Sequence, residues 1–214
     1  MNFVAVLGDH LKKTILLMVA LCCTAFLFTT MAADNAAAPQ LTVLKQDSGK
    51  NLSEMNLTLY SAIDDFGSAG LVVGEAVKFT APKAGWKLLG VQVLGWSGFN
   101  NSTKTFPADR NFLIEVRDKD FNLLYKFADA QNMYFLSSIG PVLSGMEIPA
   151  IPVSGDFYVV FYDRGAMGVA MEGDAGTGNS FFYPINGQMV PAEFKAPKTN
   201  QTIKVNWLIR AVGK

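Results

Sequence analysis

Short hydrophobic runs, separated by Gly, Pro, Asn and Asp at intervals of about ten residues, dominate the chain from Asn56 onward. Several of these runs alternate apolar and polar side chains, as strands do when one face is buried and the other is wet. This spacing is typical of an all-β sandwich or barrel, and no long helical period competes with it. The runs predict strands at residues 57–63, 75–81, 87–95, 112–118, 122–128, 146–153, 156–163, 167–172, 180–185 and 202–212.

Alternation also predicts which side chains of two strands face the core. In the strand at 112–118, one face carries Phe112, Ile114 and Val116. The other face carries Leu113, Glu115 and Arg117 and is expected to be wet. In the strand at 202–212, Ile203, Val205, Trp207 and Ile209 share one face. Trp207 is therefore predicted to lie in the core.

The strand at 156–163 does not alternate, because it carries large apolar or aromatic residues on both faces. Such a strand is usually central, with one face on the other sheet and the second covered by a loop, a partner or a ligand. Tyr158 and Tyr162 lie on the same side, and their rings suit either a partly wet sheet face or stacking on a sugar.

The stretch at 95–106, GWSGFNNSTKTF, has the amides and glycines of a loop but also carries Trp96, Phe99 and Phe106. Large rings are costly to leave in water, so they either fill a core or contact something. Alternation along the preceding strand turns Trp96 away from the valine face, unless a bulge at Gly95 resets it. Trp96 is the single residue that we most expect to contact a ligand.

The N-terminus has the pattern of an export signal. Lys12 and Lys13 precede an uncharged, largely apolar stretch at 14–33, and small residues follow, with cleavage expected near Ala32, Ala33 or the 36–38 cluster. A stretch of about 20 residues can also cross a bilayer as a helix, so an uncleaved anchor remains an alternative. The chain is thus divided into a signal peptide or signal anchor at 1–33, a flexible tether with room for one strand at 34–55, and a β-sandwich domain at 56–214.

Composition removes several functional classes. Both cysteines, Cys22 and Cys23, and the single histidine, His10, precede Ala33, so the folded part has neither thiol nor imidazole. Disulfide frameworks, Cys- or His-based zinc sites and His-dependent triads therefore lack their essential groups. The 18 basic and 18 acidic residues balance, which gives no reason to expect nucleic acid as a partner.

Carboxylates are the remaining candidates for metal binding or catalysis. Asp118 with Asp120, and Glu172 with Asp174, could contribute to a structural calcium site, although each pair also suits an ordinary turn or loop. No other cofactor is expected. A glycoside hydrolase that works with carboxylates alone is a further alternative, and its candidates are Glu115, Glu147, Glu172 and Asp174.

Sequons for N-glycosylation form another group of candidate sites, and an exported chain in a glycosylating cell would use them. The asparagines concerned are Asn51, Asn56, Asn100, Asn101 and Asn200.

The second half of the chain resembles extracellular β-sandwich modules of archaea and bacteria that stand alone behind a signal or are appended to secreted or membrane proteins. The matching features are Gly155-Asp156-Phe157-Tyr158, the Gly-containing strand at 167–172, Ser180-Phe181-Phe182 and the closing stretch 206–210, within a similarity over about residues 70–213. The resemblance implies a jelly-roll sandwich of the carbohydrate-binding type and brings no catalytic residues. Such modules often have a tyrosine near Ala170, so this chain lacks that ring.

Together these patterns predict an exported, non-catalytic binding module at the cell surface that recognises a glycan or an envelope protein. The expected ligand contacts are Trp96, Phe99, Tyr158 and Tyr162. The membrane would be contacted only through residues 14–33, if that segment is uncleaved. A structural, self-associating component of the envelope is the alternative.

Overall fold

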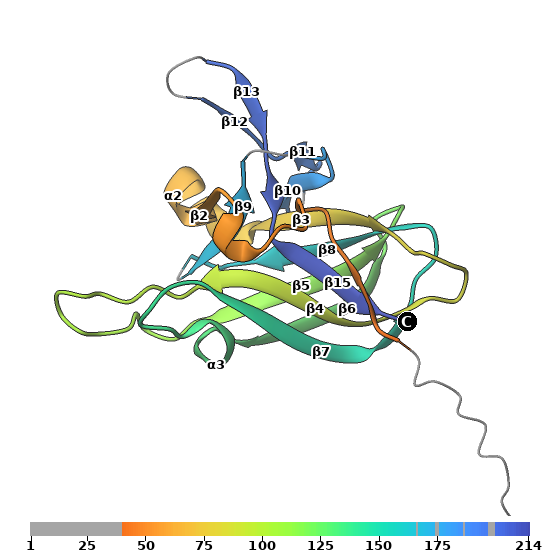
Figure 1. Ribbon diagram of the computed structural model, residues 1–214, viewed down its shortest axis with the longest axis horizontal. Helices are drawn as coiled ribbons and strands as arrows, with labels where there is room; N and C mark the ends of the chain where they lie inside the picture. Colours follow the sequence, from red (N-terminus) through yellow and green to blue (C-terminus); the bar gives the residue numbers. More distant parts are fainter. Residues whose placement is uncertain (1–39, 166, 174–175, 186, 197–199) are drawn as a thin grey trace, which may run out of the picture. The chain divides into compact units, whose positions relative to one another are not determined.

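Two antiparallel sheets form the body of the computed structural model, which describes residues 40–165, 167–173, 176–185, 187–196 and 200–214 (Figure 1). Residues from Leu41 to Lys214 form one compact unit. This arrangement confirms the prediction of an all-β chain whose antiparallel sheets are compatible with a sandwich. The predicted signal or anchor at 1–33 lies outside the described residues. Within the described part, no helix is both long and apolar enough to span a bilayer.

The first sheet has seven strands in the order β1-β15-β4-β9-β14, with β2 paired to β9 and β7 paired to β4. Its long central strand β4 makes antiparallel pairs with β15, β7 and β9. The bounds are β1 Thr42–Leu44, β2 Leu57–Tyr60, β4 Lys87–Trp96, β7 Val142–Pro152, β9 Gly168–Glu172, β14 Asn206–Trp207 and β15 Ile209–Gly213.

The second sheet has six strands in the order β11-β10-β3-β8-β5-β6. A separate two-stranded hairpin, β12 with β13, projects from the domain near the top of Figure 1. The bounds are β3 Val73–Thr80, β5 Asn111–Asp118, β6 Leu123–Ala130, β8 Asp156–Tyr162, β10 Ser180–Pro184, β11 Val190–Pro191, β12 Glu193–Lys195 and β13 Thr202–Lys204.

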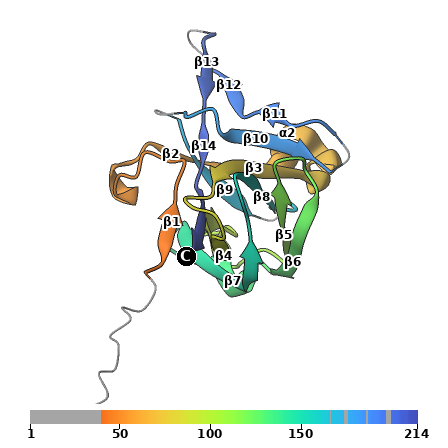
Figure 2. The same cartoon turned by 90° about the vertical axis from the view of Figure 1, so that its right-hand side faces the viewer.

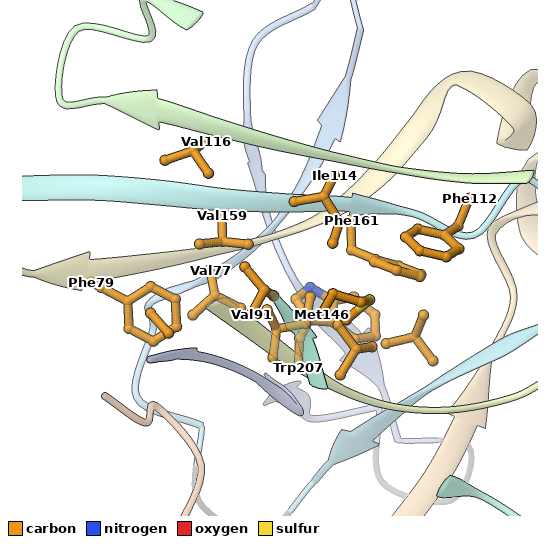
Figure 3. Packing of buried hydrophobic residues seen from close by; sticks show 14 of the residues in the cluster. Val77, Phe79, Val91, Phe112, Ile114, Val116, Met146, Val159, Phe161 and Trp207 are labelled. Atoms are coloured by element: carbon orange, nitrogen blue, oxygen red, sulfur yellow. The ribbon is translucent and has the colours of Figure 1, made fainter. Parts of the chain in front are cut away.

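The inner faces of both sheets meet in one large hydrophobic core. Val91 and Trp207 of the first sheet lie opposite Ile114, Val159 and their neighbours on the second, and all of these side chains are fully buried (Figure 3). The burial of apolar side chains between the two sheets is the main contribution to the stability of a sandwich. The core position of Trp207 was predicted correctly from alternation.

The strand directions create two distinct ends. At what we call the loop end, at the left of Figure 1, long connections and short helices meet; at the turn end, the connections are brief and lie beside the start of β1 and the end of β15. The loop end comprises 61–72, with helices α2 Ala62–Phe66 and η2 Gly67–Val72, 97–110, 131–141, with helix α3 Asn132–Phe135, and 163–165 with Met167. The turn end comprises 81–86, 119–122 and 153–155.

The segment expected as a tether is built into the domain from Leu41 onward (Figure 2). Strand β1 pairs with β15, and the Asp47 carboxylate pairs with the Arg210 guanidinium at 2.7 Å, with no accessible surface left on the Asp47 side chain. After the short helix η1 Leu52–Glu54, Met55 packs on the outer face of the first sheet. One buried ion pair and a few apolar side chains are enough to hold this segment in place. Its mostly polar composition therefore gave no sign that it belongs to the domain.

Two strand predictions were too long. The run at 57–63 becomes strand only to Tyr60, because α2 begins at Ala62. The run at 202–212 is divided among β13, β14 and β15, so that Ile203 lies in the projecting hairpin and is 38% exposed instead of joining Trp207 in the core. Alternation identified the faces correctly only where the strand stays within one sheet.

Candidate functional site

Trp96, the last residue of β4, lies on the outer face of the first sheet. The preceding Gly95 faces the core, since a Cβ there would meet Met167 and Phe135, and Trp96 therefore points the other way. The register is regular at this point, where Gly95 pairs with Val169 and Trp96 with Gly168, so no bulge resets the alternation. The side predicted for Trp96 is thus correct.

The Trp96 ring is held in one orientation but not covered. Its indole N–H donates a hydrogen bond of 2.6 Å to the carbonyl oxygen of Ser137, in the segment that follows α3. The residue is only partly buried. A fixed aromatic ring with part of its surface free costs little entropy when a ligand stacks on it.

Two shallow hollows adjoin at this ring and share Trp96, Ser97 and Gly98. The first, of about 280 Å³, is also lined by residues of β2, α2 and the β8–β9 turn. The second, of about 470 Å³, is lined by residues of the 97–110 loop. The first hollow is lined by Leu59, Tyr60, Ser61, Ile63, Asp64, Trp96, Ser97, Gly98, Gly165, Met167 and Gly168. An aromatic surface beside hydroxyl and carboxylate groups is suited to a polyhydroxylated ligand.

Phe99 and Phe106 pack against each other, with ring centroids 4.8 Å apart. Their loop is a small hairpin, in which Asn100 bridges to Thr105 and the Asn100 side chain accepts hydrogen bonds from the amides of Ser102 and Thr103. Phe106 remains 37% exposed. The rings of the 95–106 loop therefore support one another at the edge of the second hollow.

Tyr158 lies on the outer face of the second sheet, on the other side of the sandwich from Trp96. Phe121 stacks on it with centroids 4.6 Å apart, and Phe121 stacks in turn on Tyr183. Phe121 reaches this position because its backbone has a φ of 65°, which turns the β5–β6 connection back over the sheet. Tyr158 is thus covered on one face by a neighbouring loop.

Tyr162 is 1% exposed and belongs to a small cluster on the same outer face. Its hydroxyl donates to the Glu115 carboxylate at 3.2 Å, and burial together with that carboxylate raises the pKa of the phenol. Glu115 also pairs with Arg117 at 2.8 Å. The face of β5 that was expected to be wet is therefore covered, and Tyr162 offers no ring surface to a ligand.

The described carboxylates that were suggested for metal binding, Asp118, Asp120 and Glu172, each interact with other groups of the protein. Asp118 accepts hydrogen bonds from the amides of Asp120 and Asn122 and from the Asn122 side chain, an arrangement that holds its pKa below the usual range, while Asp120 pairs with Lys119. Glu172 is buried and accepts a hydrogen bond from the Ser48 amide. Asp174 lies outside the described residues. Among the residues described, no three acidic, histidine or cysteine side chains are grouped to hold a metal ion.

The carboxylates suggested for hydrolysis are likewise distributed over separate strands. Glu115 lies on β5, Glu147 is exposed on β7 and Glu172 is buried on β9. Asp174, the fourth candidate, lies outside the described residues.

A different pair of acids, not anticipated from the sequence, is buried at the loop end. Glu75 of β3 faces the core and is 0% exposed, and Asp163 directly after β8 is also 0% exposed. Burial raises the pKa of Glu75 well above its ordinary value, and the nearby Asp163 carboxylate raises it further. Burial raises the pKa of Asp163 to about 6, against the opposing effect of two backbone amides. In the sequence, the one sign of this buried acid is that Glu75 shares a strand face with the apolar Val77 and Phe79.

All of the sequon asparagines are exposed, which is the accessibility that glycosylation requires. Asn51 lies before η1, and Asn56 immediately before β2. Asn100 and Asn101 are in the hairpin beside Phe99, and Asn200 lies before β13.

Comparison with known proteins identifies no family for this chain: no protein-family model matches it, and no curated protein matches it. Of the resemblance to extracellular modules, the structure supports the β-rich architecture with two antiparallel sheets. The carbohydrate-binding and extracellular character stays a prediction.

Proposed function

We propose that this chain is an exported, non-catalytic binding module of jelly-roll type that recognises a glycan at the cell surface, with the hollow beside Trp96 as its contact site. The observation that carries the proposal is the state of the Trp96 ring, which is fixed by the bond to Ser137 yet left partly open at the junction of two hollows. Stacking of a ring on a sugar face needs no titratable group, so the lack of histidine and cysteine is no obstacle.

Tyr158 is the weaker candidate of the aromatic residues. Phe121 already occupies one face of its ring, and Phe181 approaches another edge with centroids 6.3 Å apart. A sugar would have to displace Phe121 to stack there. Trp96 requires no such displacement.

Retention on a glycan array or on envelope polysaccharide tests the site. Trp96→Ala should weaken retention by about tenfold or more, because a central aromatic contact commonly carries that share of the binding free energy. Trp96→Phe should retain part of the affinity, since it keeps a flat ring but loses the bond to Ser137.

Tyr158→Ala serves as the matched control on the other sheet, and its retention should equal that of the wild type. Equal retention by the wild type and Trp96→Ala would refute the proposed site, and a loss confined to Tyr158→Ala would move the site to the second sheet.

Self-association within an envelope is the second candidate, because apolar side chains project from the loop end. Ile139 is 97% exposed and Met133 is 73% exposed, and both belong to the 131–141 connection. Exposed apolar clusters often mark contacts with other molecules. Light scattering on the chain from Leu41 would distinguish the two, since self-association predicts oligomers that Ile139→Ser reduces, whereas a glycan module remains a monomer.

A further inference from the structure

Glu75 is the most unusual buried group in the described part of the chain. It lies on the inner face of β3 between Val73 and Val77, opposite Phe161 on β8 and Phe182 on β10, where an apolar side chain would be expected. Neither of its carboxyl oxygens has a hydrogen-bond partner among the described residues. A carboxylate without a partner in such a place is very unfavourable, so the group is neutral when it is buried.

Asp163 connects two walls of the hollow beside Trp96. One carboxyl oxygen accepts a hydrogen bond of 3.0 Å from the amide of Ala62, the first residue of α2. The other accepts one of 2.9 Å from the amide of Gly165 in the β8–β9 turn. Ser61, Ile63 and Asp64 on one side and Gly165 on the other line the hollow, so Asp163 fixes the distance between its walls.

Among the described residues, the groups that interact electrostatically with Glu75, Asp163 and Tyr60 are acidic or phenolic. Asp163 faces Glu75 from the end of β8 and Tyr60 from β2, and Asp64 and Asp65 of α2 act on Asp163 and Tyr60 respectively. None of the ion pairs found among the described residues includes Glu75 or Asp163. A negative charge on Glu75 would therefore meet Asp163 with no cation to compensate it.

We propose that the proton on Glu75 holds α2 in place as the wall of the Trp96 hollow, so that the hollow keeps its shape while Glu75 is neutral and loosens when Glu75 ionises. The effect of Glu75 on ligand binding rests on the proposed function. Its effect on the position of α2 does not. With Glu75 neutral, Asp163 bears the only charge of the pair and keeps its hydrogen bonds from the amides of Ala62 and Gly165. With both ionised, repulsion displaces Asp163, and the amide of Ala62 loses its acceptor.

The direction of the pH effect follows from the raised pKa values. A carboxyl whose pKa is raised by folding favours the folded state at low pH, and this contribution is lost as the pH rises through the folded-state value. Asp163 titrates at about pH 6 and the pKa of Glu75 is raised as well, so rising pH ionises both carboxyls and α2 loosens once both carry a charge. The Tyr60 phenol remains neutral throughout, because burial and nearby acids raise its pKa.

Amide hydrogen exchange of residues 61–72, measured on the chain as it is purified, tests the proposal without any ligand. Protection, corrected for the intrinsic exchange rate, should fall at least about tenfold between about pH 6.5 and about pH 9.5 in the wild type. In Glu75→Gln, a neutral side chain of the same size, it should not change with pH. The same fall in Glu75→Gln as in the wild type, or no fall in the wild type, would overturn the proposal.

Two further variants keep the test decisive. Asp163→Asn, the alternative if Glu75→Gln does not fold, should show weak protection of Ala62 at both pH values; strong protection there would contradict the role of Asp163. Glu115→Gln removes a buried carboxylate that contacts Arg117 and Tyr162 on the outer face of the second sheet, and should keep the pH response of 61–72 intact. If Glu115→Gln abolished that response, the effect would be one of general stability and the proposal would fail.

The two proposals fail in different ways. For any glycan retained at pH 6.5, the wild type should lose affinity at pH 9.5 in step with the amide protection, and Glu75→Gln should not. If no glycan is retained while the protection changes as described, the proposed function fails and the proton-dependent wall stands. If a glycan is retained but protection of 61–72 is independent of pH, the wall fails and the binding function stands.

Discussion

The two ends of the sandwich handle their aromatic and polar groups in opposite ways. At the turn end, Trp86 is 1% exposed and packs on Phe157 with centroids 5.9 Å apart, and the carboxylate of Asp118 closes its turn by accepting the amides that follow it. At the loop end, Trp96 is left partly open beside two hollows, and Glu75 is buried without a partner. Satisfied groups and short turns indicate structure, whereas unsatisfied groups and long connections accumulate where proteins bind.

The turn end also contains an unsatisfied polar group. The indole N–H of Trp86 is also buried without a hydrogen-bond partner among the described residues. The free-energy cost of one unsatisfied N–H is smaller than the gain from burying the large Trp86 side chain. Neither of the two hollows beside Trp96 has Trp86 in its lining.

Removing the buried tryptophan of the turn end should have the largest effect on stability. Trp86→Ala should lower the free energy of unfolding by about 3–5 kcal/mol, because a large side chain is lost from a closed site. Trp96→Ala should lower it by roughly 1 kcal/mol, since its ring is only partly buried. Denaturant titration of the two variants measures both values, and equal losses would remove the distinction between the ends.

The two buried acids of the loop end should make the free energy of unfolding depend on pH. Because Asp163 has a pKa of about 6 in the folded chain, its contribution to the free energy of unfolding falls by about 2–3 kcal/mol as the pH rises from 4 to 7. Ionisation of Glu75, whose pKa burial also raises, acts in the same direction. Chemical unfolding at a series of pH values checks this, and stability that rises from pH 4 to pH 7 would contradict it.

Replacing the unpartnered acid by an apolar side chain should stabilise the domain. Glu75→Leu removes a carboxyl whose burial is not compensated, and should raise the free energy of unfolding by about 1–3 kcal/mol at neutral pH. Thermal unfolding measures the gain. The matched change Glu115→Leu should destabilise, because it leaves Arg117 without its carboxylate; stabilisation by both would mean that the two sites do not differ.

The smallest effect on stability is expected at the exposed loop tip. Ile139→Ser should change the free energy of unfolding by less than about 0.5 kcal/mol, because the side chain is 97% exposed. A larger loss would show that Ile139 is packed in solution. Calorimetry of the monomer at low concentration separates this measurement from any effect on association.

Much of the fold was predictable because hydrophobic period and turn residues determine strands locally. The alternation around Val91 and Trp207 identified the core faces, and it also gave the outward direction of Trp96. The boundaries failed where tertiary contacts decide, as in the segment fixed by the ion pair of Asp47 with Arg210. That ion pair joins residues too far apart in the chain for a local pattern to reveal.

The site was predictable only in part. Nothing in the sequence shows that Phe121 turns back over Tyr158, since that depends on its positive φ. Glu75 and Asp163 are separated by several strands in the chain, and only the antiparallel pairing of β3 with β8 brings the ends of those strands together. Single residues and their faces follow from local pattern, whereas pairs of residues require the topology.

A titration observed through the three tryptophan indole N–H signals in a nitrogen-15 NMR spectrum tests the central claim most directly. Trp96 reports on the loop end, Trp86 on the turn end and Trp207 on the core. When envelope polysaccharide fragments are added at about pH 6.5, the Trp96 signal should shift while those of Trp86 and Trp207 stay in place. A shift of Trp86 with Trp96 unchanged, or no shift of any signal at saturating glycan, would contradict the assignment of ligand binding to the hollow beside Trp96.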